Sequence, residues 1–196
     1  MSRPIHAPSD LDATQMARVR SGDRDAFADL VDRHKDAVVN YLTRLTGNRD
    51  RAEDLAQETF LRLFRSAGSY SEQGLLRGYL FRIATNLVRS EERREKRLRL
   101  LMPFLGRQEH AEPAAPSGLL QREMHREVSA AVARLPLRYR VPLVLHEIEG
   151  WAYADIAQAL GCREGTVKSR IHRGRQHLKE RLAPYWQGGP AWKTTA

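Results

Sequence analysis

Basic and hydroxyl side chains recur along "CREGTVKSRIHRGRQHLKERL", residues 162–182. Arginine can pair bidentately with a guanine edge, whereas serine, threonine and lysine suit phosphate oxygens. Glu164 favours a helix N-terminus and can also accept a hydrogen bond from a cytosine amino group. A solvated, positively charged helix face is the competing interpretation. The candidate contacts to duplex DNA are Arg163, Glu164, Thr166, Lys168, Ser169, Arg170, Arg173 and Arg175.

The elements that must position these side chains are also visible in the sequence. In "YADIAQALG", Ile156 and Leu160 share one helix face, and the small Ala157 allows a second helix to approach closely. Gly161 stands where a tight turn needs a residue that tolerates positive φ. This pattern predicts a helix-turn-helix, in which the outward face of the second helix enters the major groove. The buried stripe expected for that helix consists of Val167, Ile171, Gly174 and Leu178.

The first half of the chain is also dominated by helical periodicity. Apolar residues recur at helical spacing in three segments between residues 27 and 88. Asp50 and Glu53 have the spacing of a capping box at the start of the second segment. Residues 102–118 contain three prolines and two glycines, so we expect a linker there. The sequence predicts an all-α fold with two small helical domains joined by a flexible linker, the C-terminal one a helix-turn-helix.

The expected boundaries follow from these patterns. We predict an N-terminal tail (1–20), a first domain (21–99), a linker (100–125), a second domain (126–184) and a C-terminal tail (185–196).

Composition limits the function classes. The chain has 33 Lys+Arg against 24 Asp+Glu, a formal net charge of +9, which favours a polyanionic partner, nucleic acid before a membrane surface. Cys162 is the only cysteine, and "HEIEG" lacks the second histidine of a zinc-hydrolase helix. We therefore expect that the chain is not an enzyme and that it binds neither a metal nor a cofactor. No apolar run approaches the roughly 18 residues that span a bilayer, so we expect a cytoplasmic protein without membrane insertion.

Both halves resemble one family. The segment "LPLRYRVPLVLHEIEGWAYADIAQALGCREGTVKSRIHRGRQHLKERL" resembles the C-terminal domain of extracytoplasmic-function sigma factors of bacterial RNA polymerase. The segment "DAFADLVDRHKDAVVNYLTRLTGNRDRAEDLAQETFLRLF", followed by "LRGYLFRIATNLVRSEERR", is similar to the N-terminal domain of that family. The resemblance implies a sigma factor that binds core RNA polymerase and promoter DNA, duplex and melted strand, and that an anti-sigma factor holds inactive.

The resemblance also assigns roles along the first domain. "EDLAQETF" is similar to the helix that docks on a coiled coil of the polymerase's largest subunit, which gives the candidate contacts Asp54, Gln57, Glu58 and Phe60. Phe60 suits the core better than an interface, and a solvated helix face is the competing interpretation for the acidic residues. "RIATNLVRSEERR" resembles the segment that reads the non-template strand of the downstream (minus-ten) element. Reading a melted strand requires a pocket that holds an unstacked base. A charge-alternating helix end is the competing interpretation. The downstream candidates are Arg82, Asn86, Arg89, Ser90, Arg93 and Arg94.

Two positions depart from the family pattern. Tyr79 stands where many relatives carry tryptophan, which keeps an aromatic ring with a polar tip. Ser90 stands where many carry an acid, which weakens any transfer of base preference at that position. A stand-alone helix-turn-helix regulator is the alternative function, but it leaves the first domain without a role.

Overall fold

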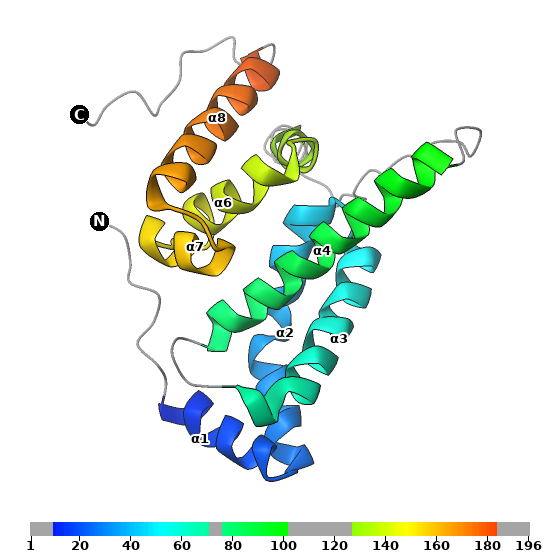
Figure 1. Cartoon of the computed structure of the whole chain (residues 1–196), viewed down its shortest axis with the longest axis vertical. Coiled ribbons are helices and arrows are strands. Elements are labelled where there is room, and N and C mark those ends of the chain that lie inside the picture. Colours follow the sequence, from blue (N-terminus) through cyan, green and yellow to red (C-terminus); the bar gives the residue numbers. More distant parts are fainter. Residues whose placement is uncertain (1–9, 71–75, 102–126, 184–196) are drawn as a thin grey trace, which may run out of the picture.

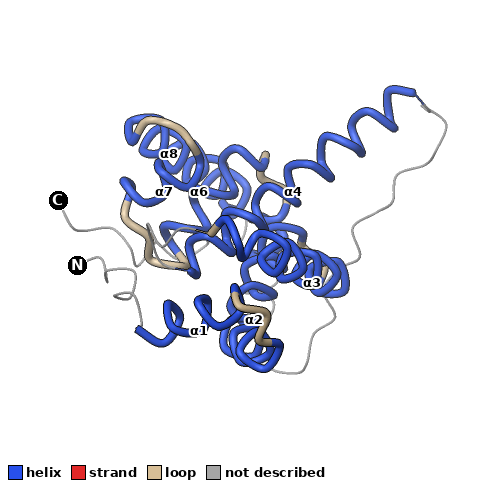
Figure 2. The backbone as a smooth tube through the Cα atoms, turned by 60° about the horizontal axis from the view of Figure 1, so that its bottom comes forward, coloured by secondary structure: helices blue, strands red, loops and turns tan. Residues whose placement is uncertain are grey.

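The computed structural model describes residues 10–70, 76–101 and 127–183 (Figure 1). Within these ranges every regular element is a helix, which confirms the all-α prediction (Figure 2). The first part of the chain forms α1 (Asp10–Arg20), α2 (Arg24–Thr46), α3 (Arg49–Ser66), the short 3₁₀ helix η1 (Ala67–Ser69) and α4 (Leu76–Leu101). The second part forms a helical segment over residues 127–133, α6 (Leu137–Glu147), α7 (Tyr153–Leu160) and α8 (Glu164–Leu182).

The first domain is a bundle in which α2 contacts both α3 and α4. The predicted apolar stripes face its interior, where Leu30, Leu42 and Leu80 have no exposed surface. The ring of Tyr41 stacks on Phe81 at a centroid distance of 4.4 Å, and its hydroxyl lies 2.7 Å from the buried Thr85 Oγ1. Burial raises the pKa of Tyr41 above its usual value. The C-terminal part of α4 extends beyond this bundle (Figures 1 and 2).

Helix α1 lies in the stretch that the sequence analysis assigns to an N-terminal tail. Met16 and Val19 are buried against the bundle, and the Arg20 guanidinium donates to the carbonyl oxygen of Tyr70 at 2.6 Å. Only two apolar residues of this helix are buried, whereas Leu11 is 62% exposed. The apolar pattern was therefore too short to predict a helix from periodicity.

The start of α3 differs from the predicted capping box. Gly47 adopts a left-handed conformation (φ 72°) and ends α2, so the next helix begins at Arg49. Its N-cap is Asn48, whose side chain accepts a hydrogen bond from the Arg51 amide at 2.9 Å. Glu53 instead pairs with Arg49 at 2.9 Å, and the capping-box prediction was wrong.

The remaining predicted boundaries fall largely outside the described residues. Helix α4 extends through Leu101, so the first two residues of the predicted linker are helical. The rest of that linker and the C-terminal tail lie outside the described ranges. The positions of the domain boundaries stay a prediction. Within the described part of the chain, no helix is both long and apolar enough to cross a membrane.

Candidate nucleic-acid interfaces

The turn before α8 has the geometry that the sequence predicts. Gly161 is left-handed (φ 62°, ψ 42°), and its amide donates to the carbonyls of Ala157 and Gln158 at the end of α7. The Cys162 amide also donates to the Ala157 carbonyl at 3.0 Å. An L-residue with a side chain disfavours this conformation, so glycine allows the chain to reverse here. Helix α8 then begins at Glu164 and crosses α7 as a helix-turn-helix (Figure 1).

The buried side of α8 packs against α6 and α7. Val167 and Ile171 are at most 1% exposed, which confirms the predicted stripe, while Leu178 is half-buried. Gly174 lies so close to α6 that a Cβ there would stand 2.9 Å from Leu143 Cδ1. This contact fixes the rotation of α8 and therefore determines which residues point outward.

The exposed face of α8 lies opposite that stripe. At about 100° per residue, Ser169 and Arg173 point away from the buried side, and the half-buried Thr166 lies beside it. Gln176 and His172 are exposed on the same face, and sequence reasoning missed them. Their spacing could have revealed them, because His172 follows Ser169 by three residues and Gln176 follows Arg173 by three, which places each pair on one helix face.

The other predicted contacts of α8 lie at its edges or start. Lys168 pairs with Glu164 at 3.2 Å, and Arg175 pairs with Glu147 of α6 at 2.5 Å. Arg170 is half-buried, with one guanidinium nitrogen 4.0 Å from Cys162 Sγ, and Arg163 is exposed at the N-cap position. The outward face therefore suits base edges, and the flanking cations suit phosphates.

The downstream candidates lie along α4. Arg82, Asn86, Arg89, Ser90 and Arg93 share one stripe at about 100° per residue, and Arg94 lies at its edge, next to Ser90. Apart from Arg89, which is half-buried, the members of the stripe are exposed, and Arg93 donates to Ser90 Oγ at 3.3 Å.

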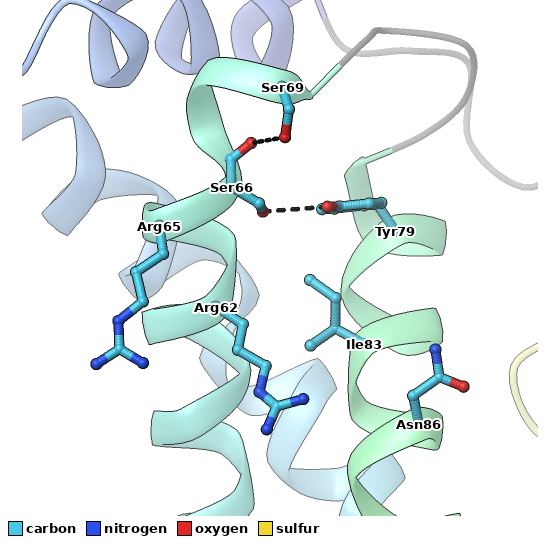
Figure 3. Close-up of a pocket in the computed structure, with 7 residues that line it drawn as sticks. All are labelled: Arg62, Arg65, Ser66, Ser69, Tyr79, Ile83 and Asn86. Atoms are coloured by element: carbon cyan, nitrogen blue, oxygen red, sulfur yellow. Dashed lines mark hydrogen bonds between the residues drawn. The ribbon is translucent and has the colours of Figure 1, made fainter.

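A cavity of about 450 Å³ opens between α3 and α4 beside this stripe (Figure 3). Its walls combine guanidinium, hydroxyl, amide and aromatic groups. The lining residues are Arg62, Arg65, Ser66, Ser69, Tyr79, Ile83 and Asn86. Of these, sequence reasoning proposed only Asn86 as a contact, because the walls come from α3, η1 and α4, and no periodicity reveals the distances between these elements.

Tyr79 forms the aromatic wall of the cavity, and three neighbouring side chains hold its ring in place. The Tyr79 hydroxyl lies 3.1 Å from Ser66 Oγ, as Figure 3 shows. The Tyr70 ring meets it edge-on at 5.0 Å, and the Arg82 guanidinium lies 5.0 Å from the Tyr79 ring centroid. An aromatic face, an amide and nearby guanidinium groups are the set that binds an unstacked nucleobase and its phosphate.

An acidic face of α3 adjoins this cavity. Asp54 and Gln57 are exposed, and Glu58 is partly exposed. Leu61, 47% exposed and seven residues after Asp54, lies on the same face and was missed. Glu58 accepts from Arg62 Nε at 2.8 Å, and this hydrogen bond lowers the pKa of Glu58. The acidic face and the cavity are thus linked by the ion pair between Glu58 and Arg62.

Phe60 does not belong to that acidic face. It is 6% exposed and packs in the core of the bundle, about 120° around α3 from Asp54. The prediction that Phe60 contacts a partner needs this correction: its ring supports the helix from inside. In the described part of the chain, no group of three or more His, Cys, Asp or Glu residues is placed to hold a metal ion.

Both halves of the chain match known families. Residues 30–98 match the family described as Sigma-70 region 2, and residues 125–178 match Sigma-70, region 4. The ECF RNA polymerase sigma factor SigE of Mycolicibacterium smegmatis is 41% identical over 170 residues, which cover 84% of this chain and 66% of that protein. The ECF RNA polymerase sigma factor SigW of Bacillus subtilis is 33% identical over 185 residues, which cover 86% of this chain and 95% of that protein.

Solved structures agree with these matches. The sigma factor RpoE of Bartonella quintana, in complex with the anti-sigma factor NepR, matches with a TM-score of 0.67 at 28% identity, over 80% of this chain and 96% of that chain. CnrH, in complex with the cytosolic domain of CnrY, matches with a TM-score of 0.65 at 25% identity, over 89% of this chain and 98% of that chain.

Proposed function

The chain belongs to the extracytoplasmic-function sigma factors of bacterial RNA polymerase, and we propose how its surfaces divide promoter recognition. It is a sigma factor that serves in transcription initiation. Helix α8 reads the upstream (minus-thirty-five) element as duplex, and α4 with its cavity captures the melted strand of the downstream element.

The upstream role is supported by the exposed face of α8. Ser169 and Arg173 lie opposite the buried stripe and the half-buried Thr166 lies beside it, so all three can meet the groove when the helix-turn-helix docks. Arg163 and Lys168 stand near the N-terminus of α8, where they can neutralise phosphates and set the register. Arg175 must exchange Glu147 for DNA before it can contribute, because the two side chains are paired at 2.5 Å.

The downstream role is supported by the cavity between α3 and α4. A flipped base entering it would meet the Tyr79 ring and the Asn86 amide, and Arg62 and Arg65 would face the backbone phosphate. Unstacking a base costs a few kcal/mol, so a binding site for the exposed base is required to hold the strand open. Arg89 and Arg93 extend the basic track along the same stripe.

The partners follow from the family and from the acidic face of α3. Asp54, Gln57 and Glu58, with Leu61, form a surface for core RNA polymerase. An anti-sigma factor is a further partner, because the structural relative RpoE binds the anti-sigma factor NepR, and CnrH binds the cytosolic domain of CnrY. Sigma factors are regulatory subunits, so the chain acts without catalytic activity of its own, in the cytoplasm where the polymerase works.

The cavity is the observation that carries this proposal. A stand-alone helix-turn-helix regulator would explain α8, but it gives no role to the open cavity lined by Asn86 and Tyr79. The comparisons do not favour that alternative either.

Reconstituted transcription tests the proposal. We expect a run-off transcript with core polymerase and a cognate promoter, and a loss of tenfold or more for Asn86→Ala with core binding retained. Asn40→Ala, the same substitution at an exposed position of α2, serves as the matched control and should behave like wild type. DNA binding without polymerase and no transcript with it would contradict the proposal.

A further inference from the structure

The N-terminal helix α1 is tied to the turn that follows α3. Arg20, the last residue of α1, donates from Nε to the Ala67 carbonyl oxygen at 3.3 Å and from Nη2 to the Tyr70 carbonyl oxygen at 2.6 Å. Arg20 is itself exposed, whereas Ala67 and Tyr70 are only 4% and 6% exposed. One guanidinium group therefore holds the two ends of η1 from a helix that is distant in the sequence.

The short helix η1 benefits from such an outside partner. It has three residues, and the Tyr70 amide donates to the Ala67 carbonyl oxygen at 3.3 Å. Short 3₁₀ helices have poor hydrogen-bond geometry, and the carbonyl groups at a helix end lack partners within the helix. Hydrogen bonds from a charged guanidinium group are roughly twice as strong as those between neutral groups. Arg20 therefore helps to keep Ala67 and Tyr70 in place.

The residues of η1 and its flanks also support the cavity between α3 and α4. The Tyr70 ring lies edge-on to the Tyr79 ring, with centroids 5.0 Å apart and an interplanar angle of 62°. Ser69 Oγ donates to the Ser66 carbonyl oxygen at 3.0 Å, and Ser66 Oγ lies 3.1 Å from the Tyr79 hydroxyl (Figure 3). Ser66, Ser69 and Tyr79 all line the cavity. A shift of η1 would consequently move the wall that Tyr79 forms.

We propose that Arg20 is a positioning residue of the downstream DNA-binding site: by holding η1, it fixes the orientation of the Tyr79 ring that receives an unstacked base. The inference rests on the proposed function, in which the base stacks on this aromatic face. Arg20 is not among the residues that line the cavity, so it acts through Tyr70 and Tyr79 and does not touch the base. Helix α1 thereby takes part in reading the melted strand.

Loss of the Arg20 guanidinium should leave α1 docked, because other contacts join α1 to the bundle. Met16 and Val19 are 1% and 3% exposed. The Asp12 carboxylate of α1 pairs with Arg33 of α2 at 2.7 Å. A substitution of Arg20 therefore tests the contact with η1 and not the docking of the whole helix.

Binding of the reconstituted holoenzyme to a premelted promoter fragment tests this role. The downstream element is single-stranded in this fragment, so the Kd reports base capture without the cost of melting. Arg20→Met removes the guanidinium group and keeps an unbranched side chain, and we expect it to raise the Kd about threefold or more. Arg18→Met in the same helix is the matched control and should leave the Kd unchanged, because Arg18 pairs with Asp23 at 2.7 Å. A pull-down with core polymerase and circular dichroism verify that each variant assembles and keeps its helices.

A double-mutant cycle with Tyr79→Ala separates positioning from a general loss of stability. Because Arg20 acts through the Tyr79 ring, adding Arg20→Met to Tyr79→Ala should raise the Kd no further, whereas independent effects would multiply. Multiplying effects, or a wild-type Kd for Arg20→Met beside a raised Kd for Tyr79→Ala, would overturn this inference alone. A wild-type Kd for Tyr79→Ala would instead overturn the capture of a base in the cavity, and with it the proposed function.

Discussion

Gly174→Ala perturbs the contact that sets the rotation of α8. Two effects oppose each other at this position. Alanine is favoured over glycine in a helix interior by about 0.8–1.0 kcal/mol. The added methyl group, however, would stand 2.9 Å from Leu143 Cδ1, and Leu143 is 2% exposed and has little room to move. Overpacking of a filled core costs about 1–3 kcal/mol, so we expect a net loss of roughly 1 kcal/mol.

Gly165→Ala provides the matched control in the same helix. Nothing lies within 4 Å of a Cβ at Gly165, so the substitution should be neutral or stabilising. For a domain of 60–100 residues, a loss of 1 kcal/mol lowers the melting temperature by about 4–8 °C. Thermal unfolding followed by circular dichroism measures both variants.

The binding of each variant to upstream duplex completes this test. Because Gly174→Ala displaces α8 from α6, it should weaken duplex binding, whereas Gly165→Ala should weaken it less. A Gly174→Ala variant that is as stable as Gly165→Ala and binds duplex equally well would refute the account of how α8 is positioned.

Three further predictions concern other surfaces. Glu58→Ala should weaken polymerase binding and also promoter opening per bound holoenzyme, because Glu58 holds Arg62 beside the cavity, whereas Asp54→Ala should weaken polymerase binding alone. A pull-down measures polymerase binding and permanganate footprinting measures promoter opening. Equal promoter opening by the two variants would contradict the link between Glu58 and the cavity. Arg173→Ala should cost about 1–3 kcal/mol of upstream affinity in fluorescence anisotropy if it reads a base, and an unchanged affinity would remove it from the interface. Burial raises the pKa of Tyr41, so above about pH 10 the unfolded chain loses the phenol proton before the folded chain does, and the free energy of unfolding falls as pH rises. Tyr41→Phe should make this fall less steep in chemical denaturation. An unchanged slope would mean that other groups cause the loss of stability.

The sequence was sufficient for features that lie within one helix or one turn. The stripe of Val167 and Ile171 and the turn at Gly161 depend on local periodicity and on a single backbone conformation, and both are confirmed. The stripe of α4 was equally readable, because apolar and polar residues alternate at helical spacing. The family resemblance then supplied the order of the two domains.

Features that depend on distances between helices could not be read in this way. Arg62 and Arg65 of α3 become cavity walls only because α4 packs beside α3 and brings Tyr79 and Asn86 near them. Phe81 of α4 is buried between the rings of Tyr41 in α2 and Trp151, 70 residues later, and the periodicity of α4 shows neither contact. Helix α1 was missed because only two of its apolar residues, Met16 and Val19, are buried, which is too few to show a helical period.

The capture of a downstream base in the cavity is the central claim, and fluorescence of 2-aminopurine tests it most directly. The probe replaces single bases of the non-template strand in a promoter bound by the reconstituted holoenzyme. We predict that one downstream position becomes unstacked with wild type and with Asn40→Ala, and that Asn86→Ala and Tyr79→Ala reduce its signal by tenfold or more. Wild-type signals from Asn86→Ala and Tyr79→Ala holoenzymes would contradict the claim that this cavity holds the base.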